Sequence, residues 1–257
     1  MRKLHVALLQ ADLIWHDPMA NQKQLAKQLA VLPEQTNLVV LPEMWATGFT
    51  MTPSEVAEPI NGSSVQWMQH MAQTYDTAVC GSLSIKEGKT FFNRFVFVHP
   101  SGSINTYDKV HPYTPSGEAR IYTAGTKREL IEYAGFRIRP LVCYDLRFPV
   151  FVRNTDHYDL LICVANWPTA RIQAWNALLQ ARAIENMAYS IGVNRTGKDA
   201  YRLNYPGASA AYNALGDELV FMEQKETVAT FSIALDELHA LREKLPFLQD
   251  MDDFTLG

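Results

Sequence analysis

Cysteine is scarce in this sequence. The 257 residues contain Cys80, Cys143 and Cys163, which are too few and too scattered for a disulfide framework or a C-x-x-C metal site. We therefore expect no structural disulfide and no metal centre. A chain of this kind suits a reducing compartment, where a thiolate stays available for chemistry, so we expect a cytoplasmic location.

Long apolar runs and an excess of basic residues are also missing. No window approaches the roughly 20 apolar residues needed to span a bilayer. Residues 1–7 enter a short strand-like run at once and lack the features of a signal peptide. The formal net charge of −4 argues against nucleic acid or an anionic membrane as the main partner.

The sequence shows no linker, no low-complexity segment and no internal repeat. A hydrophobic content of 47% with 19% charged residues is ordinary for a globular protein with ample material for a core. These features predict a single domain over residues 1–257. Within it, the acidic segment 245–257 is expected to be an extended tail.

Strand-like and helix-like stretches alternate along the chain. Helical spacing of apolar residues is found at 19–31, 63–75, 169–187 and 235–243, with Ser63 or Ser64 as the N-cap of the second and Ser232 or Asp236 near the start of the last. Strand-like runs lie at 4–10, 37–41, 77–85, 90–99, 103–108, 129–133, 136–142, 159–165, 189–193, 208–212, 218–222 and 227–233. The similar order in the two halves predicts an α/β fold in which two sheets pack face to face with helices outside.

Three residues with chemical potential each follow a strand-like run. Glu43 follows residues 37–42, Lys109 follows residues 103–108, and Cys143 follows residues 138–142. Strand ends in an α/β domain are where such side chains converge. A base, a fixed cation and a nucleophile together suffice to hydrolyse an amide through a thioester.

Each of these residues also has an ordinary structural interpretation. Glu43 fits a helix cap or a loop carboxylate paired with an Arg, and its apolar neighbours would raise its pKa by desolvation. Lys109 fits a solvated surface residue, and Cys143 fits an inert buried thiol. The polar residues directly after Cys143 favour a strand-to-turn junction, where backbone N–H groups favour the thiolate. Cys80 and Cys163 fit the inert interpretation well.

Two further motifs offer alternatives. His111, two residues after Lys109, would form a papain-like dyad if it paired with a Cys, although nothing local marks it beyond its loop. Residues 194–199 look like a fragment of a nucleotide-binding motif. They lack the Gly-rich phosphate loop, so we interpret them as a loop between strands.

Taken together, the motifs resemble those of the nitrilase (carbon–nitrogen hydrolase) superfamily, and the match extends from Leu4 to about Leu245. The matching segments are Leu41-Pro42-Glu43, Tyr107-Asp108-Lys109-Val110-His111, residues 113–118 with Glu118, residues 142–149 with Cys143, residues 165–168, and residues 175–186. This resemblance implies a four-layer α-β-β-α sandwich that assembles as a homodimer. It implies no metal or organic cofactor.

The short chain and the segment Cys143-Tyr144-Asp145-Leu146-Arg147-Phe148-Pro149 look most like the omega-amidases. The resemblance implies hydrolysis of a small keto-acid amide, 2-oxoglutaramate or 2-oxosuccinamate. Cys143 would attack the amide carbon and Glu43 would move the proton. Lys109 and the backbone N–H of Tyr144 would stabilise the oxyanion. Glu118 would hold Lys109 charged and oriented.

The distal carboxylate of such a substrate requires a cation, and the bidentate fork of Arg suits it best. Arg171 is the favoured residue because its loop should overhang the strand end that carries Cys143. The other candidates are Arg147, Arg195 and Arg120, and Arg147 would alternatively be an ion-pair partner of Asp145 or Glu118.

Rival functions stay open at this point. The nearest is an amidase of the same superfamily that acts on deaminated glutathione or small aliphatic amides. A nitrile substrate is disfavoured by the short chain. A catalytically dead interaction module is disfavoured by the intact set of Glu43, Lys109 and Cys143.

Overall fold

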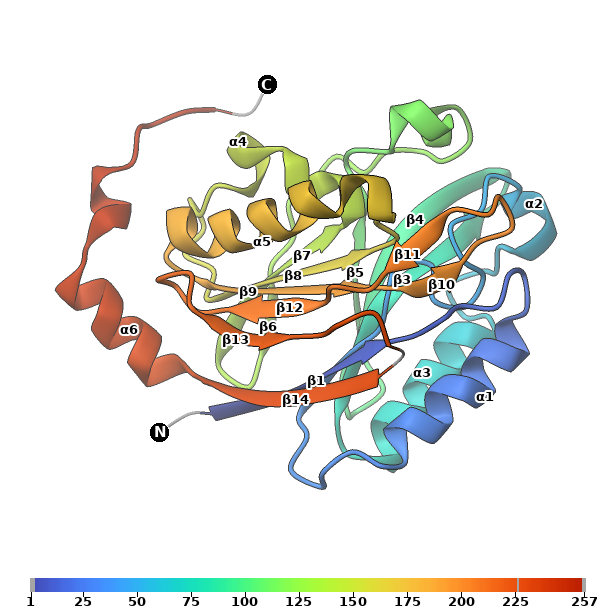
Figure 1. Cartoon of the computed structure of the whole chain (residues 1–257), viewed down its shortest axis with the longest axis horizontal. Helices are drawn as coiled ribbons and strands as arrows, with labels where there is room; N and C mark the ends of the chain where they lie inside the picture. The colour runs from blue at the N-terminus through green and yellow to red at the C-terminus, as the bar shows by residue number, and fades with distance from the viewer. Residues whose placement is uncertain (1–2, 226, 256–257) are drawn as a thin grey trace.

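The computed structural model describes residues 3–225 and 227–255. Over these residues the chain forms two six-stranded sheets and a separate two-stranded ribbon, with helices on the outer faces (Figure 1). No helix in the described part of the chain is both long and apolar enough to cross a membrane. The last two residues of the predicted tail, 256–257, lie outside the described residues.

The first sheet has the order β14-β1-β2-β3-β4-β5. Its central strands β1, β2 and β3 are parallel. Strand β14 pairs antiparallel with β1, β4 pairs antiparallel with β3 in the predicted hairpin, and β5 pairs antiparallel with β4. The strands are β1 (Lys3–Gln10), β2 (Leu38–Val40), β3 (Ala78–Glu87), β4 (Thr90–Val98), β5 (Ile104–Asp108) and β14 (Thr227–Ala234).

The second sheet has the order β13-β12-β9-β8-β7-β6. Strands β7, β8 and β9 are parallel, and β8 is buried along its whole length, as its apolar sequence predicted. The strands are β6 (Ile131–Tyr133), β7 (Phe136–Val142), β8 (Leu160–Ala165), β9 (Tyr189–Asn194), β12 (Ala210–Tyr212) and β13 (Glu218–Phe221).

Alternation along β1 shows how the layers form. Val6 and Leu8 belong to the core cluster that includes residues of the second sheet, whereas Ala7 and Leu9 belong to the cluster that includes α1 (Pro18–Leu29) and α3 (Ser63–Thr74). One face of the sheet therefore packs on the other sheet and the opposite face packs on helices. With α5 (Ile172–Asn186) on the far side, this is the predicted α-β-β-α sandwich (Figure 1).

Helix α5 lies very close to the second sheet because β9 carries a glycine at the contact. A Cβ atom on Gly192 would stand 2.5 Å from a side-chain atom of Leu179 and 2.6 Å from one of Trp175. The helix starts later than predicted, because Thr169–Arg171 forms a 3-10 turn (η4). It ends at Met187, whose left-handed backbone closes the helix.

The predicted N-cap of α3 is wrong. Gly62 occupies the cap position, and Ser63 and Ser64 are the first helical residues. The carboxylate of Glu58 replaces a serine cap, because it accepts hydrogen bonds from the backbone N–H of Ser64 at 2.8 Å and from both serine hydroxyls.

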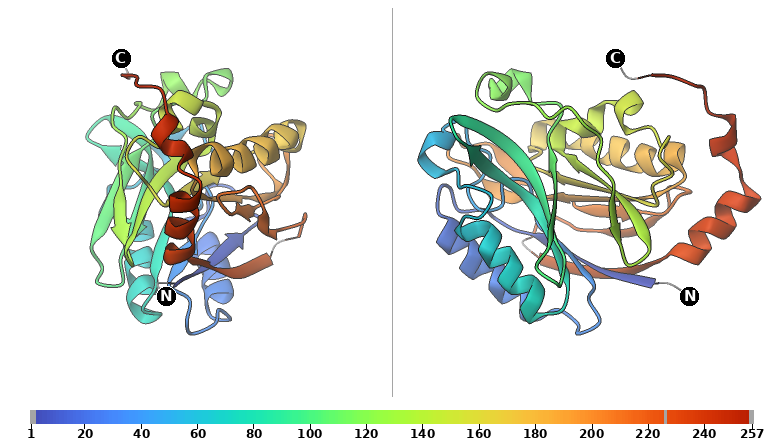
Figure 2. Two further views of the ribbon diagram at one scale, coloured as in Figure 1. Left: turned by 90° about the vertical axis from the view of Figure 1, so that its left-hand side faces the viewer. Right: turned by 180° about the vertical axis from the view of Figure 1, so that it is seen from behind.

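Helix α6 (Leu235–Lys244) and the segment after it run along one end of the sandwich, outside its layers (Figure 2). The helix begins after Ala234, between the two predicted starts, Ser232 and Asp236. The expected extended tail contains one 3-10 turn, η5 (Phe247–Asp250), and residues 251–255 form no helix or strand. The other short helices are α2 (Pro53–Val56), α4 (Pro149–Val152), η1 (Thr114–Ser116), η2 (Glu118–Arg120) and η3 (Cys143–Arg147).

The predicted loop at 194–199 is wrong. Thr196–Lys198 is a strand, β10, which pairs with β11 (Asn204–Pro206) in a short ribbon. The turn between them is held by Asp199, whose Oδ1 accepts hydrogen bonds from the backbone N–H groups of Tyr201 and Leu203 at 2.9 Å each. Three polar residues show no alternation of hydrophobicity, so the sequence pattern gives no strand signal here.

Candidate active site

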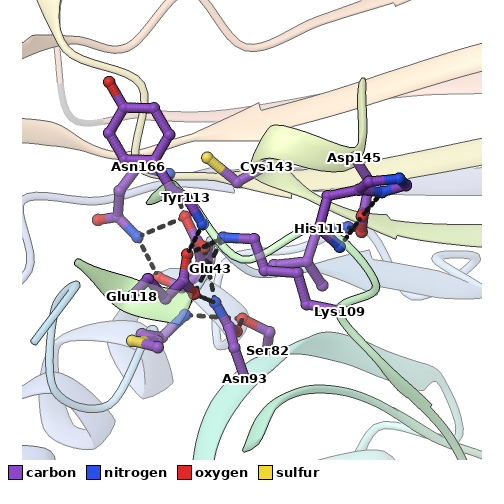
Figure 3. A network of polar contacts seen from close by, with 12 residues as sticks. Glu43, Ser82, Asn93, Lys109, His111, Tyr113, Glu118, Cys143, Asp145 and Asn166 are labelled. Atoms are coloured by element: carbon purple, nitrogen blue, oxygen red, sulfur yellow. Dashed lines mark hydrogen bonds and ion pairs between the residues drawn. The ribbon is translucent and has the colours of Figure 1, made fainter. Parts of the chain in front are cut away.

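The strand ends bring Glu43 and Lys109 into direct contact next to Cys143 (Figure 3). Glu43 follows β2 after Leu41 and Pro42, Lys109 follows β5 directly, and Cys143 follows β7 directly. The Nζ atom of Lys109 lies 3.0 Å from Oε1 of Glu43, and both side chains are almost fully buried. The convergence of the three predicted residues is therefore present.

Glu118 is the second carboxylate on Lys109. Its Oε2 and Oε1 atoms lie 2.8 and 3.1 Å from Nζ, and the backbone N–H of Tyr113 donates to Oε2. Burial alone would lower the pKa of Lys109, but Glu118 and Glu43 outweigh it and hold that pKa well above its usual value. The ammonium therefore stays charged. Burial, opposed by Lys109 and aided by Glu43, raises the pKa of Glu118.

Glu43 is oriented by four donated hydrogen bonds. Its Oε1 accepts from Lys109 and, at 2.8 Å, from Nδ2 of Asn93. Its Oε2 accepts from the backbone N–H and from Nδ2 of Asn166, at 2.8 and 3.2 Å. The Asn166 amide also donates to the backbone carbonyl of Glu43 at 2.8 Å. Carboxylate and main chain are thus fixed together.

Asn93 is a site residue that the sequence interpretation missed. Its Nδ2 group donates to Glu43 at 2.8 Å and to Glu118 at 3.0 Å, so a single buried amide bridges both carboxylates. Its Oδ1 accepts from the hydroxyl of Ser82 at 2.9 Å, and that hydroxyl accepts from the backbone N–H of Met44. An amide within a strand rich in phenylalanine was the available signal.

Asn166 could have been found by the rule that found the three main residues, because it follows β8 directly. Its backbone N–H donates to Glu43 and also lowers the pKa of the Cys143 thiol. One peptide group therefore faces both the carboxylate and the sulfur.

Cys143 sits in a constrained turn between β7 and η3. Its backbone is left-handed, with φ of 51°, which is uncommon for a residue with a side chain. The buried carboxylate of Asp145 holds this turn, because it accepts from the backbone N–H of Val142 at 3.0 Å and from the Tyr107 hydroxyl at 2.8 Å. Asp145 therefore holds both the turn that carries Cys143 and the end of β5 in place.

His111 also contacts Asp145. Its backbone N–H and its ring Nδ1 lie 2.9 and 2.8 Å from Oδ1 of Asp145, and its ring stacks on Phe148 with centroids 3.8 Å apart. The ring is thus engaged by Asp145 and Phe148. A papain-like pairing with Cys143 has no support in this geometry.

The expected backbone donor to Cys143 is present, because the N–H of Asn166 lowers the pKa of the thiol, but it is not the largest influence on that pKa. Burial first, and the neighbouring Glu43 second, raise the pKa of the Cys143 thiol well above its usual value, although Lys109 and the Asn166 N–H act in the opposite direction. The resting nucleophile is a protonated thiol, so its attack requires a base. Cys80 and Cys163 are fully buried.

A cavity of about 530 Å³ opens onto Cys143. Phe49, whose ring centre is 5.4 Å from Nζ of Lys109, lines it, as do the predicted substrate-binding residues Tyr144 and Arg171. Arg147 lines it as well. Asp145 and Glu118 are occupied by the partners described above, so the predicted ion pair of Arg147 with either carboxylate is not formed.

The other two candidate arginines do not line this cavity. Arg195 is fully buried, where its Nη2 pairs with Asp12 at 3.0 Å. Arg120 is exposed on η2. The sequence interpretation also missed the β10–β11 ribbon, from which Asp199, Tyr201, Leu203 and Tyr205 form one wall of the cavity.

The arrangement has the parts needed for acyl transfer at a carbonyl: a thiol, an oriented carboxylate and a permanently charged ammonium. Among the described residues, no group of three or more His, Cys, Asp or Glu side chains is placed to hold a metal ion.

Comparison with known proteins agrees with this chemistry. The carbon-nitrogen hydrolase family model matches residues 5–243. The chain belongs to the carbon–nitrogen hydrolase family. It is an enzyme that hydrolyses carbon–nitrogen bonds, and its sandwich is the fold of the nitrilase superfamily.

Individual relatives are similar over their full length. The chain is 41% identical to omega-amidase YafV of Yersinia enterocolitica over 100% of both chains. It is 28% identical to the 2-oxoglutaramate amidase of Bacillus subtilis, covering 97% of this chain and 98% of that protein. A solved structure of a CN-hydrolase superfamily protein from Xanthomonas campestris superposes with a TM-score of 0.97 at 39% identity over 100% of both chains.

Proposed function

We propose that this carbon–nitrogen hydrolase is an omega-amidase, which converts 2-oxoglutaramate or 2-oxosuccinamate to the keto dicarboxylate and ammonia. The observation that carries the proposal is the contact of Lys109 with Glu43 beside Cys143, which lines a cavity that is also lined by two arginines. Full-length similarity to proteins named omega-amidase and 2-oxoglutaramate amidase supports the choice of substrate.

The first half of the reaction forms a thioester. Because burial keeps the Cys143 thiol protonated, Glu43 takes its proton as the sulfur attacks the amide carbon. The C–N bond then breaks, and Glu43 delivers the proton to the departing ammonia. Asn93 and Asn166 keep the carboxylate in place through both transfers.

The tetrahedral oxyanion requires donors at the position where its charge develops. The Lys109 ammonium and the backbone N–H of Tyr144 supply them. Glu118 holds Lys109 charged and oriented through its two contacts at 2.8 and 3.1 Å. Water activated by Glu43 then hydrolyses the thioester and restores the thiol.

Arg171 binds the distal carboxylate of the substrate. Support comes from its position on the cavity wall, with the guanidinium carbon 4.9 Å from the ring centre of Tyr113. A guanidinium over an aromatic ring keeps its N–H edge available for a carboxylate.

The enzyme acts as a homodimer in the cytoplasm. Dimer formation is supported by large apolar side chains that are exposed on α5 and around β13, namely Ile184, Leu215, Leu219 and Phe221. A cytoplasmic location is supported by the free thiol on which the chemistry depends.

A second candidate is an amidase for deaminated glutathione or small aliphatic amides. The cavity of about 530 Å³ has room for the larger of these substrates.

Ammonia release from 2-oxoglutaramate, deaminated glutathione and an aliphatic amide, with and without a thiol alkylator, tests the proposal. We expect the highest kcat/KM for 2-oxoglutaramate and complete loss after alkylation. A preference for either other substrate would reject the omega-amidase assignment, and turnover that survives alkylation would reject the thioester route.

A further inference from the structure

His111 and the buried carboxylate of Asp145 form a contact that the proposed reaction does not use (Figure 3). His111 donates to Oδ1 of Asp145 from its backbone N–H at 2.9 Å and from its ring Nδ1 at 2.8 Å. An ionised carboxylate only accepts hydrogen bonds, so Nδ1 carries the ring hydrogen. Neither residue is among the described residues that line the cavity opening onto Cys143. Their contact can therefore affect the reaction only through other residues.

The segment that carries Lys109 is held to Asp145 at both of its ends. Tyr107 lies two residues before Lys109, and its hydroxyl donates to Oδ2 of Asp145 at 2.8 Å. His111 lies two residues after Lys109 and donates to Oδ1. The ring of His111 stacks on Phe148 with centroids 3.8 Å apart, which limits its movement. The backbone that presents the ammonium is therefore fixed relative to this carboxylate.

The turn that carries Cys143 is held by the same carboxylate. Val142 precedes Cys143 and donates its backbone N–H to Oδ2 of Asp145 at 3.0 Å, and Asp145 itself follows Cys143 by two residues. The left-handed backbone of Cys143, with φ of 51°, requires support from its surroundings. A single carboxylate thus connects the end of β5 with the turn after β7, and these two strands belong to different sheets.

Asp145 makes this connection without a Lys or Arg partner. Its side chain is fully buried, and no Lys or Arg in the described part of the chain forms an ion pair with it. A buried carboxylate costs free energy unless hydrogen bonds replace its hydration. The loss of one of its four donors should therefore shift the groups around it rather than leave the site unchanged.

We propose that His111 is a positioning residue, which through Asp145 sets the distance between the Lys109 ammonium and the Cys143 sulfur. The inference rests on the proposed function, in which Lys109 stabilises the oxyanion that forms when Cys143 attacks the amide. A displaced ammonium stabilises the transition state less, although the substrate still binds. Loss of the His111 donor should therefore lower kcat and leave KM nearly unchanged.

Steady-state kinetics of His111→Phe and His111→Asn with 2-oxoglutaramate test the proposal. The phenylalanine ring can still stack on Phe148 but has no donor, whereas the asparagine amide places a donor close to the position of Nδ1. We expect kcat to fall by about 10- to 100-fold in His111→Phe, with KM within about threefold of the wild type. His111→Asn should recover most of this loss. A histidine that transferred protons would not be replaced by an amide, because an amide does not titrate.

Alkylation of Cys143 by iodoacetamide separates positioning from a general loss of structure. This reaction forms no oxyanion, so its rate in His111→Phe should stay within about threefold of the wild type while turnover falls. Tyr107→Phe removes the hydroxyl donor to the other oxygen of Asp145 and keeps the buried ring, so it should show the same separation. His70→Phe, at an exposed position of α3, is the matched control and should change neither quantity.

A His111→Phe enzyme with wild-type kcat would overturn the proposal. An equal fall in turnover and alkylation would also overturn it, because the change would then act on the nucleophile or on the whole fold. A His111→Asn enzyme as inactive as His111→Phe would point to proton transfer instead of positioning. If His111→Phe does not fold, Tyr107→Phe decides by the same criteria.

A wild-type enzyme without activity on 2-oxoglutaramate would reject the proposed function, which is a separate outcome. The His111 variants would then be compared on the amide that the enzyme does hydrolyse, with the same expected separation of kcat from the alkylation rate.

Discussion

Glu43 has two effects on the Cys143 thiol, one on its pKa and one on its reaction. The carboxylate of Glu43 helps to raise the pKa of the Cys143 thiol, and the same carboxylate is the proposed acceptor of its proton. A thiol whose pKa is raised in this way is not a ready thiolate. It depends on a base that is held in place, and four donated hydrogen bonds hold Glu43.

Glu43→Gln should therefore have two opposite effects. Removing the negative charge lowers the pKa of Cys143, so the pH dependence of iodoacetamide alkylation should shift to lower pH. Turnover should nevertheless fall by roughly 10²- to 10⁴-fold because the general base is lost. An alkylation profile that shifts to higher pH, or turnover that survives, would contradict the role of Glu43.

The raised pKa of Glu118 determines the direction in which its contribution to the free energy of unfolding changes with pH. Its pKa in the folded state lies above the ordinary value of 4.5, so the folded state binds the proton more tightly than the unfolded state does. Its contribution to the free energy of unfolding is thus fully present below pH 4.5 and is lost as the pH rises through the folded pKa.

Glu118→Gln should remove this loss. The free energy of unfolding of the variant, relative to the wild type, should rise with pH across that window in urea titrations at several pH values. Lys109 keeps its contact with Glu43 and its raised pKa places its own titration far above this range, so it adds no slope there. A difference that falls with pH would show that the pKa of Glu118 is not raised in the folded state.

At the residue scale the sequence predicted three residues that follow strands, but it missed Asn166, which follows β8, and Asn93, which lies inside β4. Glu43, Lys109 and Cys143 could be found because a polar residue that ends an apolar run is visible along the chain. Asn93 could not be assigned, because its role depends on which residues of other elements face it across the fold. The roles of Tyr144 and Arg171 stay predictions.

Among the elements, the β10–β11 ribbon determines the shape of the cavity although its sequence gives little sign of structure. Gly197 lies in the ribbon with φ of 81°, and a Cβ atom there would stand 1.9 Å from Oδ1 of Asp12. That oxygen also accepts from Nη2 of Arg195 at 3.0 Å. The left-handed backbone of Gly197 and the Asp12 carboxylate packed against it therefore both favour glycine at this position of the ribbon.

Gly197→Ala should raise KM for the substrate as well as lower the stability of the fold. The added methyl must displace Asp12, and the shift moves the cavity wall formed by residues 199–205, so KM for 2-oxoglutaramate should rise by about tenfold or more. Gly88→Ala is the matched control, because Gly88 has φ of 59° and a Cβ atom added there would meet nothing within 4 Å. It should cost about 1–2 kcal/mol of stability for its backbone and leave KM unchanged. Equal KM values in the two variants would contradict this account of the ribbon.

Most regular elements agree with their predicted bounds because their apolar periodicity is strong. The differences have local causes: Glu58 substitutes for a serine cap at α3, and a 3-10 turn delays the start of α5. The order of the strands within the sheets, unlike the bounds of the elements, could not be predicted from local periodicity. The pairing of β14 with β1 joins opposite ends of the chain, and no local pattern encodes it.

For the whole molecule, we propose that the chain is one domain, because residues of both sheets and of α5 share a continuous core. The layered fold was predicted in two ways: by the alternation of strand-like and helical stretches, and more specifically by the motifs that resemble the nitrilase superfamily. The homodimer was implied by that resemblance alone.

Light scattering tests the homodimer. We expect a mass twice the 29.1 kDa of one chain at micromolar concentration. Ile184→Asp places a charge on the exposed apolar face of α5 and should shift the mass toward that of a monomer. A monomeric wild type, or a variant that remains fully dimeric, would contradict the proposed use of this face.

The central claim is that Cys143 is the nucleophile of an amide hydrolase. The most direct test is ammonia release from 2-oxoglutaramate by Cys143→Ala, with circular dichroism and thermal unfolding to show that the sandwich is intact. We expect no turnover above background in a variant that unfolds like the wild type. A folded Cys143→Ala enzyme with wild-type turnover would contradict the account.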